Sequence, residues 1–216
     1  MTGPAVTGPA ASAAAGALDP ARTGLVVFDM LEAYRAAIEQ AGTLAPVQRL
    51  VAGARGAGVP VFWARADHRA DGADLALTRT DTDQQLRPWT PEHPQPVRPP
   101  HASGSPGLQV LAELGPRPED YDVPKHRWSA FCGTHLELSL RSRGVDTVLL
   151  VGGSTHVGIA STAYAARDLD LQVVVVRDGC HGSAEQREFF LDRVFPRMCR
   201  VRTVAEVLTA LAEGSA

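Results

Sequence analysis

Several short runs in this chain are apolar at every position, and this feature constrains the fold more than any other. Residues 173–176 are four consecutive valines, and residues 147–151 read Thr-Val-Leu-Leu-Val. Strands buried on both faces have such sequences, and they occur in parallel sheets that helices cover on both sides. Strands are predicted at residues 24–28, 59–64, 121–124, 147–151, 172–176 and 199–201.

Segments with helical spacing separate these runs. In residues 46–57, for example, Val47, Leu50, Val51 and Ala54 form one apolar stripe. Strands that alternate with helices predict an α/β protein with three layers, α/β/α. The middle layer is expected to be a Rossmann-like, mostly parallel sheet of about six strands. Helices are predicted at residues 46–57, 108–114, 134–143, 157–168, 185–195 and 204–211.

Residues 67–106 interrupt this alternation. Within them, residues 87–100 read RPWTPEHPQPVRPP, where proline recurs too often for a helix or an inner strand. Irregular segments of this length are usually functional or disordered. We therefore expect either a loop on the substrate side of the site or a surface excursion.

The length of 216 residues predicts one domain with a tail in front of it. The chain begins MTGPAVTGPAASAAAGA, which has no charge and lacks the basic start and large-residue apolar core of a secretory signal. Residues 1–20 are therefore expected to be a disordered Ala/Gly/Pro-rich tail, and residues 21–216 a single α/β domain.

The charge balance and the apolar pattern argue against two classes of partner. A net charge of −3 gives no basic face for nucleic acid or an acidic membrane surface. No run reaches the roughly 18 apolar residues that a membrane span needs. Cys132, Cys180 and Cys199 are too few and too scattered for a disulfide framework or a zinc site, which favours a reduced, cytoplasmic setting.

In an open parallel sheet the ligand site lies beyond the carboxyl ends of the strands. Asp29 and Lys125 each follow a predicted strand. A carboxylate after five apolar residues is costly unless it is paired or used, and an aspartate–lysine pair in a half-buried cleft is typical of catalytic sites. The simpler alternatives are that Asp29 caps a helix and that Lys125 is a surface lysine.

The dipeptide Asp67-His68 also follows a predicted strand. Without a further well-spaced histidine, it favours a hydrogen-bonded pair in a loop over a metal site. No metal ion and no cofactor are therefore expected.

The turn at residues 149–158, LLVGGSTHVG, joins a predicted strand to a predicted helix. The dipole at a helix start favours a neutral His156, and the main-chain N–H groups of residues 157–159 are expected to face the cleft and to bind an anion. A capping or packing role for His156 is the alternative. Ser154 does not fit a nucleophile elbow, because His156 stands where that motif needs a glycine.

Four segments together resemble the isochorismatase-like hydrolases. They are FDM (28–30), KHRWSAF (125–131), LLVGGSTHVGIASTAYAARD (149–168) and VVVVRDGC (173–180). This family includes cysteine amidohydrolases such as nicotinamidase, N-carbamoylsarcosine amidase and ureidoacrylate hydrolase. The resemblance covers residues 23–211, and it implies a small-molecule substrate, no cofactor, and a homodimer or homotetramer.

The resemblance assigns the family's catalytic aspartate to Asp29 and its lysine to Lys125. The family's nucleophilic cysteine, in a turn of the form G-x-x-T-x-x-C, falls on Gly158, which cannot supply the thiolate of a thioester mechanism. The family often has a non-proline cis peptide in this turn, here between Gly153 and Ser154. The residues expected to bind substrate are Ser154, Thr155, His156, Gly158, Trp128 and His68.

The isochorismatases proper tend to carry histidine and glycine in this turn, and residues 155–158 read Thr-His-Val-Gly. The leading hypothesis is therefore cleavage of a vinyl ether in a small anionic metabolite, in secondary metabolism, with Asp29 as the acid and Lys125 as its partner. One alternative is hydrolysis of an amide or ureido C–N bond, by direct water attack or with Cys132 as a displaced nucleophile. Another is a non-hydrolytic biosynthetic enzyme or a binding protein.

Overall fold

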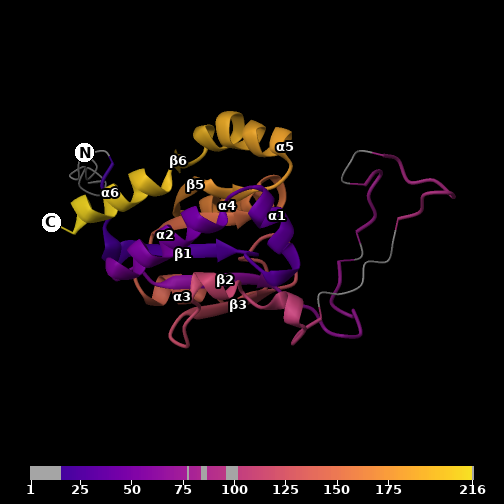
Figure 1. Cartoon of the computed structure of the whole chain (residues 1–216), viewed down its shortest axis with the longest axis horizontal. Helices are drawn as coiled ribbons and strands as arrows, with labels where there is room; N and C mark the ends of the chain where they lie inside the picture. Colours follow the sequence, from indigo (N-terminus) through magenta and orange to yellow (C-terminus); the bar gives the residue numbers. More distant parts are fainter. Residues whose placement is uncertain (1–15, 77, 84–86, 96–101, 216) are drawn as a thin grey trace, which may run out of the picture.

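The computed structural model describes residues 16–76, 78–83, 87–95 and 102–215, and these residues contain one sheet of six parallel strands (Figure 1). The strand order is β3-β2-β1-β4-β5-β6, and the sequence prediction of a six-stranded parallel sheet is confirmed. The strands are β1 (Thr23–Phe28), β2 (Val61–Ala66), β3 (Tyr121–Lys125), β4 (Thr147–Gly153), β5 (Gln172–His181) and β6 (Arg200–Arg202).

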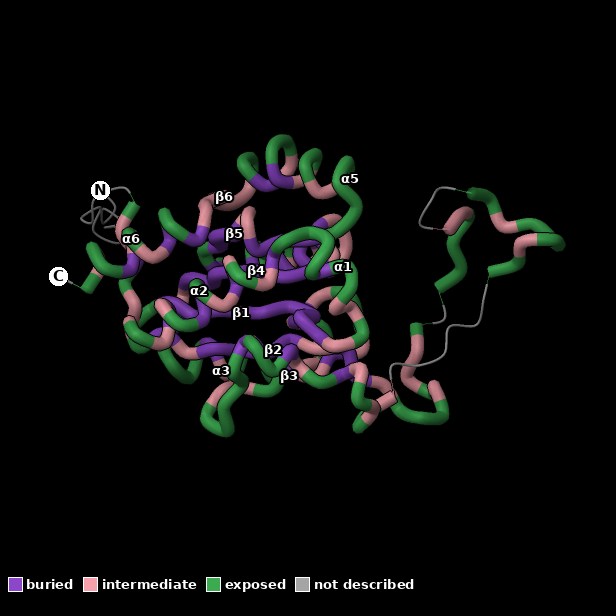
Figure 2. The backbone as a smooth tube through the Cα atoms, in the orientation of Figure 1, coloured by how far each residue is buried: buried purple, intermediate pink, exposed green. Residues whose placement is uncertain are grey.

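Alternate residues of β1 pack against different helices, which makes the three layers. Leu25 and Val27 belong to a core that α2 (Leu44–Gly56) and α6 (Val204–Gly214) cover. Val26 and Phe28 belong to a second core under α3 (Leu136–Ser142) and α4 (Ala160–Asp168). The inner strands β2, β1, β4 and β5 are largely buried and the outer helix faces are exposed, as Figure 2 shows. Burial on both faces explains why the strand sequences do not alternate.

Three predicted helices differ from the observed structure, and the one at residues 108–114 is absent. Residues 108–114 form two short 3-10 turns, Pro106–Leu108 and Ala112–Leu114, with extended backbone between them. A bridge between Leu31 and Val110 and a 3.0 Å hydrogen bond from Leu111 N to Met30 O hold this stretch against the segment after β1. These tertiary contacts replace the helix that the local spacing favours.

The helix predicted at residues 157–168 begins in the structure with a π-helical turn, Thr155–Ile159, which leads into α4. The predicted helix at 185–195 is likewise divided, into α5 (Ala184–Phe189) and a π-helical turn, Phe190–Val194. Such turns widen the helix locally and are frequent at functional sites. The short helix α1 (Arg35–Gln40) has no counterpart in the sequence prediction.

The irregular segment runs out from the α/β body at the edge where β2 ends (Figure 1). A bridge between His68 and Ala102 closes its base, and Trp89 stacks on His93 at 5.0 Å between ring centroids. Residues 96–100 of the proline-rich stretch lie outside the described residues. Its described residues up to 105 contain no helix, as the proline content of residues 87–100 predicts for that part.

The N-terminal boundary lies slightly earlier than expected. Residues 1–15 are outside the described part, but Leu18 is buried in the core and its N–H donates to Ala210 O at 3.0 Å. Contact with the domain therefore begins before residue 21. Among the described residues, no helix combines the length and the apolar content that crossing a membrane requires.

Candidate active site

The two charged residues at the predicted strand ends form a buried ion pair. Lys125 Nζ donates to Asp29 Oδ2 at 2.7 Å, and Asp29 Oδ1 accepts a hydrogen bond from Ala66 N at 2.8 Å. The exposed fraction is 9% for Asp29 and 5% for Lys125. The pair is formed because β1 and β3 both flank β2 and all three strands end at the same edge. Such a pair is costly to bury, which makes it a candidate for chemistry.

Asp29 adopts a backbone conformation that is rare for a residue with a side chain. Its φ is 48°, in the left-handed region, where a non-glycine residue is held at a cost of about 1–3 kcal/mol. Its N–H donates to Ala64 O at 2.8 Å, so β2 keeps the residue in place. Strain of this kind clusters at functional sites, which is a second reason to place the site here.

The ring of Phe28 fills the space in front of Gly158. A Cβ added at Gly158 would lie 2.2 Å from Cε1 and 2.5 Å from Cζ of that ring. The ring is fully buried, and Lys125 Nζ lies 4.2 Å from its centroid, in cation–π range. Phe28 therefore touches both Gly158, to which the resemblance assigns the family's cysteine position, and the lysine. Sequence reasoning missed this role, and the only signal was an aromatic residue directly before Asp29.

The start of the turn depends on a close approach between two strands. Gly152 is paired with Phe28 and has a φ of +116°, and a Cβ there would lie 2.0 Å from Phe28 O. Only glycine fits this position. The peptide bond between Gly153 and Ser154 is cis, as the resemblance implies.

The remaining groups of the turn mostly bond to one another. Ser154 Oγ lies 3.1 Å from His156 Nδ1, and the buried Thr155 Oγ1 donates to His181 O at 2.7 Å. The N–H groups of Val157 and Ile159 were expected to face the cleft, but both donate to Ser154 O at 3.2 Å. The π-helical turn redirects them, so the expected anion site lacks two of its donors.

Burial lowers the pKa of His156, which agrees with a neutral imidazole. Of the other candidates, Trp128 is 68% exposed three residues after Lys125. His68 lies beside His126, with ring centroids 5.6 Å apart.

Two of the three cysteines are poor nucleophiles. Burial raises the pKa of the Cys180 and Cys199 thiols to about 12 in each case, so both remain protonated near neutral pH. Cys132 is exposed.

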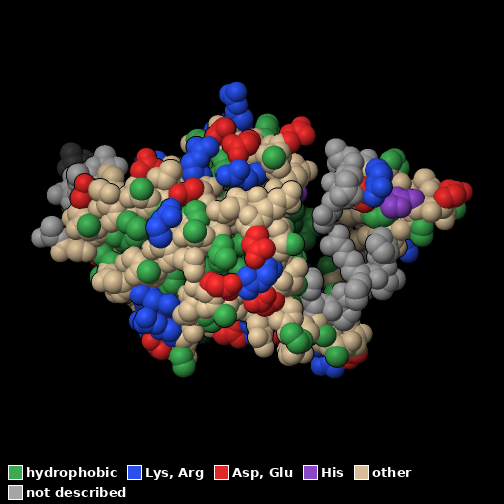
Figure 3. Space-filling view, viewed as in Figure 1, with side chains coloured by type: hydrophobic (Ala, Val, Ile, Leu, Met, Phe, Trp, Pro, Cys, Tyr) green, Lys and Arg blue, Asp and Glu red, His purple; other side chains and the backbone are tan. Residues whose placement is uncertain are grey.

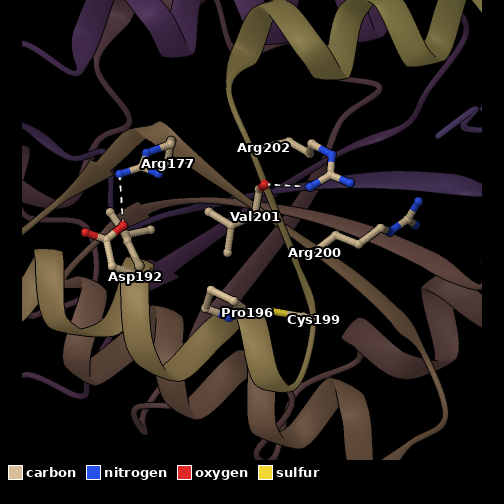
Figure 4. A pocket seen from close by; sticks show the side chains of 8 residues that line it. Arg177, Asp192, Pro196, Cys199, Arg200, Val201 and Arg202 are labelled. Atoms are coloured by element: carbon tan, nitrogen blue, oxygen red, sulfur yellow. Dashed lines mark hydrogen bonds and ion pairs between the residues drawn. The ribbon is translucent and has the colours of Figure 1, made fainter. Parts of the chain in front are cut away.

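A hollow of about 430 Å³ lies along the edge strand β6 (Figure 4). Arg177 pairs there with Asp192 at 3.2 Å, and burial together with the charge of Arg202 lowers the pKa of Arg200. The residues that line the hollow are Arg177, Leu191, Asp192, Pro196, Cys199, Arg200, Val201 and Arg202. The lining includes none of the predicted site residues, so we place the candidate active site at the ends of β1 and β3. On the face shown in Figure 3, acidic and basic side chains are interspersed.

Comparisons with known proteins agree with the observed fold. The family model for the isochorismatase domain matches residues 23–206. An uncharacterized isochorismatase family protein, YecD of Escherichia coli O157:H7, is 37% identical over 164 residues, covering 76% of this chain and 80% of that protein. The ureidoacrylate amidohydrolase RutB of Methylobacterium radiotolerans is 32% identical over 181 residues, covering 76% of this chain and 69% of that protein.

A solved structure of an isochorismatase family protein from Burkholderia thailandensis has a TM-score of 0.76 and 29% identity, covering 91% of this chain and 98% of the other. The family match spans nearly all of the described domain, and the structural neighbour has the same fold. The chain therefore belongs to the isochorismatase-like hydrolase family.

Proposed function

We propose that this chain hydrolyses a small anionic metabolite without a cysteine nucleophile, and that its leading reaction is cleavage of a vinyl ether. The observation that carries the proposal is the Phe28 ring, which lies where a side chain at residue 158 would begin. A thiol at that position needs space that the ring already fills. The high pKa of about 12 of both Cys180 and Cys199 also argues against a thiolate route.

Vinyl ether hydrolysis suits a site that offers an acid but no nucleophile. Asp29 transfers a proton to the terminal alkene carbon, and the ether oxygen stabilises the resulting oxocarbenium ion. Water adds to that ion and returns a proton to the Asp29 carboxylate, and the hemiketal then separates into a ketone and an alcohol. Asp29 ends the first step as a carboxylate, which Lys125 stabilises at 2.7 Å.

The acid role requires Asp29 to be protonated before that step, although the structure places it beside an ammonium group. A carboxylate on the substrate would offset the positive charge of Lys125 and so favour the protonated form of Asp29. The proposal therefore specifies an anionic substrate.

The second candidate is hydrolysis of an amide or ureido C–N bond. Its support is the similarity to RutB proteins, at 32% and 30% identity, whose names describe ureidoacrylate amidohydrolases. In this chain the reaction would use direct attack by water, or the exposed Cys132.

The test is a substrate panel of enolpyruvyl ethers and of ureido and amido acids matched in size and charge. Release of pyruvate from the ethers, with no turnover of the C–N compounds, is the expected outcome. Release of ammonia from the ureido acids would replace the leading reaction with the second candidate. Parallel assays of Cys132→Ser show whether any C–N activity depends on that thiol.

A further inference from the structure

Two histidines are brought side by side by the register of the sheet, next to the candidate active site. In the pairing of β2 with β3, Ala66 lies opposite Lys125, and Asp67 N donates to Lys125 O at 3.0 Å. His68 and His126 therefore follow two paired strand ends, and their ring centroids are 5.6 Å apart. We propose that these two histidines and Asp74 form a binding site for one divalent transition-metal ion of the zinc class.

The three side chains have the spacing that such an ion needs. His68 Nδ1 lies 3.3 Å from Asp74 Oδ1, and His126 Nδ1 lies 3.2 Å from Asp74 Oδ2. One ligand atom from each residue falls within 4.8 Å of the other two. Bonds of about 2.0–2.2 Å from zinc to imidazole nitrogen and carboxylate oxygen give tetrahedral edges of about 3.4 Å. Two imidazoles and one carboxylate are also a donor set that zinc and its neighbours accept.

His68 provides a second observation that points to a ligand. Its side chain is only 13% exposed, and its buried Nδ1 faces Asp74 Oδ1 at 3.3 Å without a well-aligned hydrogen bond to any described residue. Leaving a buried polar atom unsatisfied costs about 1–3 kcal/mol, and native structures contain few of them. A metal ion between His68 and Asp74 would satisfy this atom.

Asp74 is held in place by main-chain contacts. Arg69 N lies 3.2 Å from each carboxylate oxygen, and Arg127 NH1 donates to Asp74 O at 2.7 Å. These contacts fix the carboxylate near both histidines, as metal ligation requires.

His126 also contacts a main-chain carbonyl. Its Nδ1 lies against Asp67 O as well as near Asp74 Oδ2, so without a metal one imidazole proton faces both oxygens. Ligation through Nδ1 replaces that proton with the ion, and the ring shifts away from the carbonyl. The ion would then tie the loop after β2 to the end of β3, one residue from Lys125.

The experiment is a metal titration of the full chain after treatment with a chelator. Calorimetry with Zn²⁺ measures affinity and stoichiometry, and the visible spectrum with Co²⁺ reports coordination number and ligand type. We expect one equivalent to bind with a tetrahedral Co²⁺ spectrum. Losing an outer-shell partner of a metal typically costs 10–100-fold in affinity, so Asp74→Asn, which removes a ligand charge, should weaken binding by about 100-fold or more.

Asp71→Asn is the matched control, because Asp71 is an exposed acid in the same loop that pairs with the side chain of Arg69. His135→Ala controls for histidine number, since His135 bonds to Ser139 and Asp122 O away from the cluster. Both controls should bind as the unchanged chain does. Equal affinity of the unchanged chain and Asp74→Asn, or an octahedral Co²⁺ spectrum without saturation at one equivalent, overturns the proposal. The titration of the unchanged chain is informative even where a variant folds poorly.

Discussion

Two neighbouring regions at the carboxyl edge of the sheet differ in the kind of polar contact that they form. At the ends of β1 and β3, Asp29 and Lys125 present a charged pair from positions 96 residues apart. In the turn after β4, by contrast, the Thr155 hydroxyl donates to His181 O, and the N–H groups of residues 157 and 159 donate to Ser154 O. In the proposed reaction the ion pair performs the chemistry, while the glycines of the turn set the shape of the site.

The largest effect is expected from breaking the charged pair. Asp29→Asn keeps the acceptor for Ala66 N but removes the acidic proton, so turnover should fall by about 100-fold to 10,000-fold. Steady-state kcat, together with substrate binding and a thermal melt, separates loss of chemistry from loss of fold. A fully active Asn variant would exclude Asp29 as the acid.

The second prediction concerns the histidine packed behind the turn. Burial and then the charge of Arg187 lower the pKa of His181 to about 4 in the folded protein, against 6.5 for the ordinary group. Between these values the unfolded chain binds more protons, so stability is full above pH 6.5 and is lost as the pH falls toward 4.

The loss attributable to His181 is on the order of 3 kcal/mol, at 1.36 kcal/mol per pKa unit. Urea unfolding at several pH values measures it, and His181→Gln should flatten the profile in this range. Identical pH profiles for the two proteins would show that His181 is not buried in its neutral form.

The third prediction tests whether Gly158 in the turn is tightly packed against the Phe28 ring. Gly158→Ala places a methyl group against the Phe28 ring, and overpacking of this kind typically costs about 1–3 kcal/mol. Phe28→Leu should reduce that cost, so the double variant should be more stable than the sum of the two single effects predicts. Additive unfolding free energies would mean that the ring and Gly158 are not coupled.

The smallest effect is expected from removing the exposed thiol. Cys132→Ser should leave kcat within about twofold, because surface substitutions usually change stability by less than about 0.5 kcal/mol and the proposed reaction uses no thiol. Alkylation of the native protein under the same assay is the companion measurement. Substantial loss in both would turn attention to Cys132 as a nucleophile.

The strands and the position of the charged pair could be read from the sequence, because both depend on local pattern. Continuous apolar runs marked the four inner strands, and the rule that ligand sites follow parallel strand ends placed Asp29 and Lys125 among the candidates. By contrast, the helix predicted at 108–114 is absent because Leu31 and Val110, distant in sequence, form a bridge. Local spacing contains no information about such a contact.

The same division, between what local pattern predicts and what contacts between distant segments decide, applies inside the site. The sequence by itself determined the fold class, the strand ends and the glycine at residue 158. Only the tertiary structure decided that the Phe28 ring fills the space at Gly158, and that His126 and Asp74 lie beside His68. The physical reason is that periodicity reports which face of an element is buried, whereas the direction and neighbours of a side chain depend on strand register and on packing between distant segments.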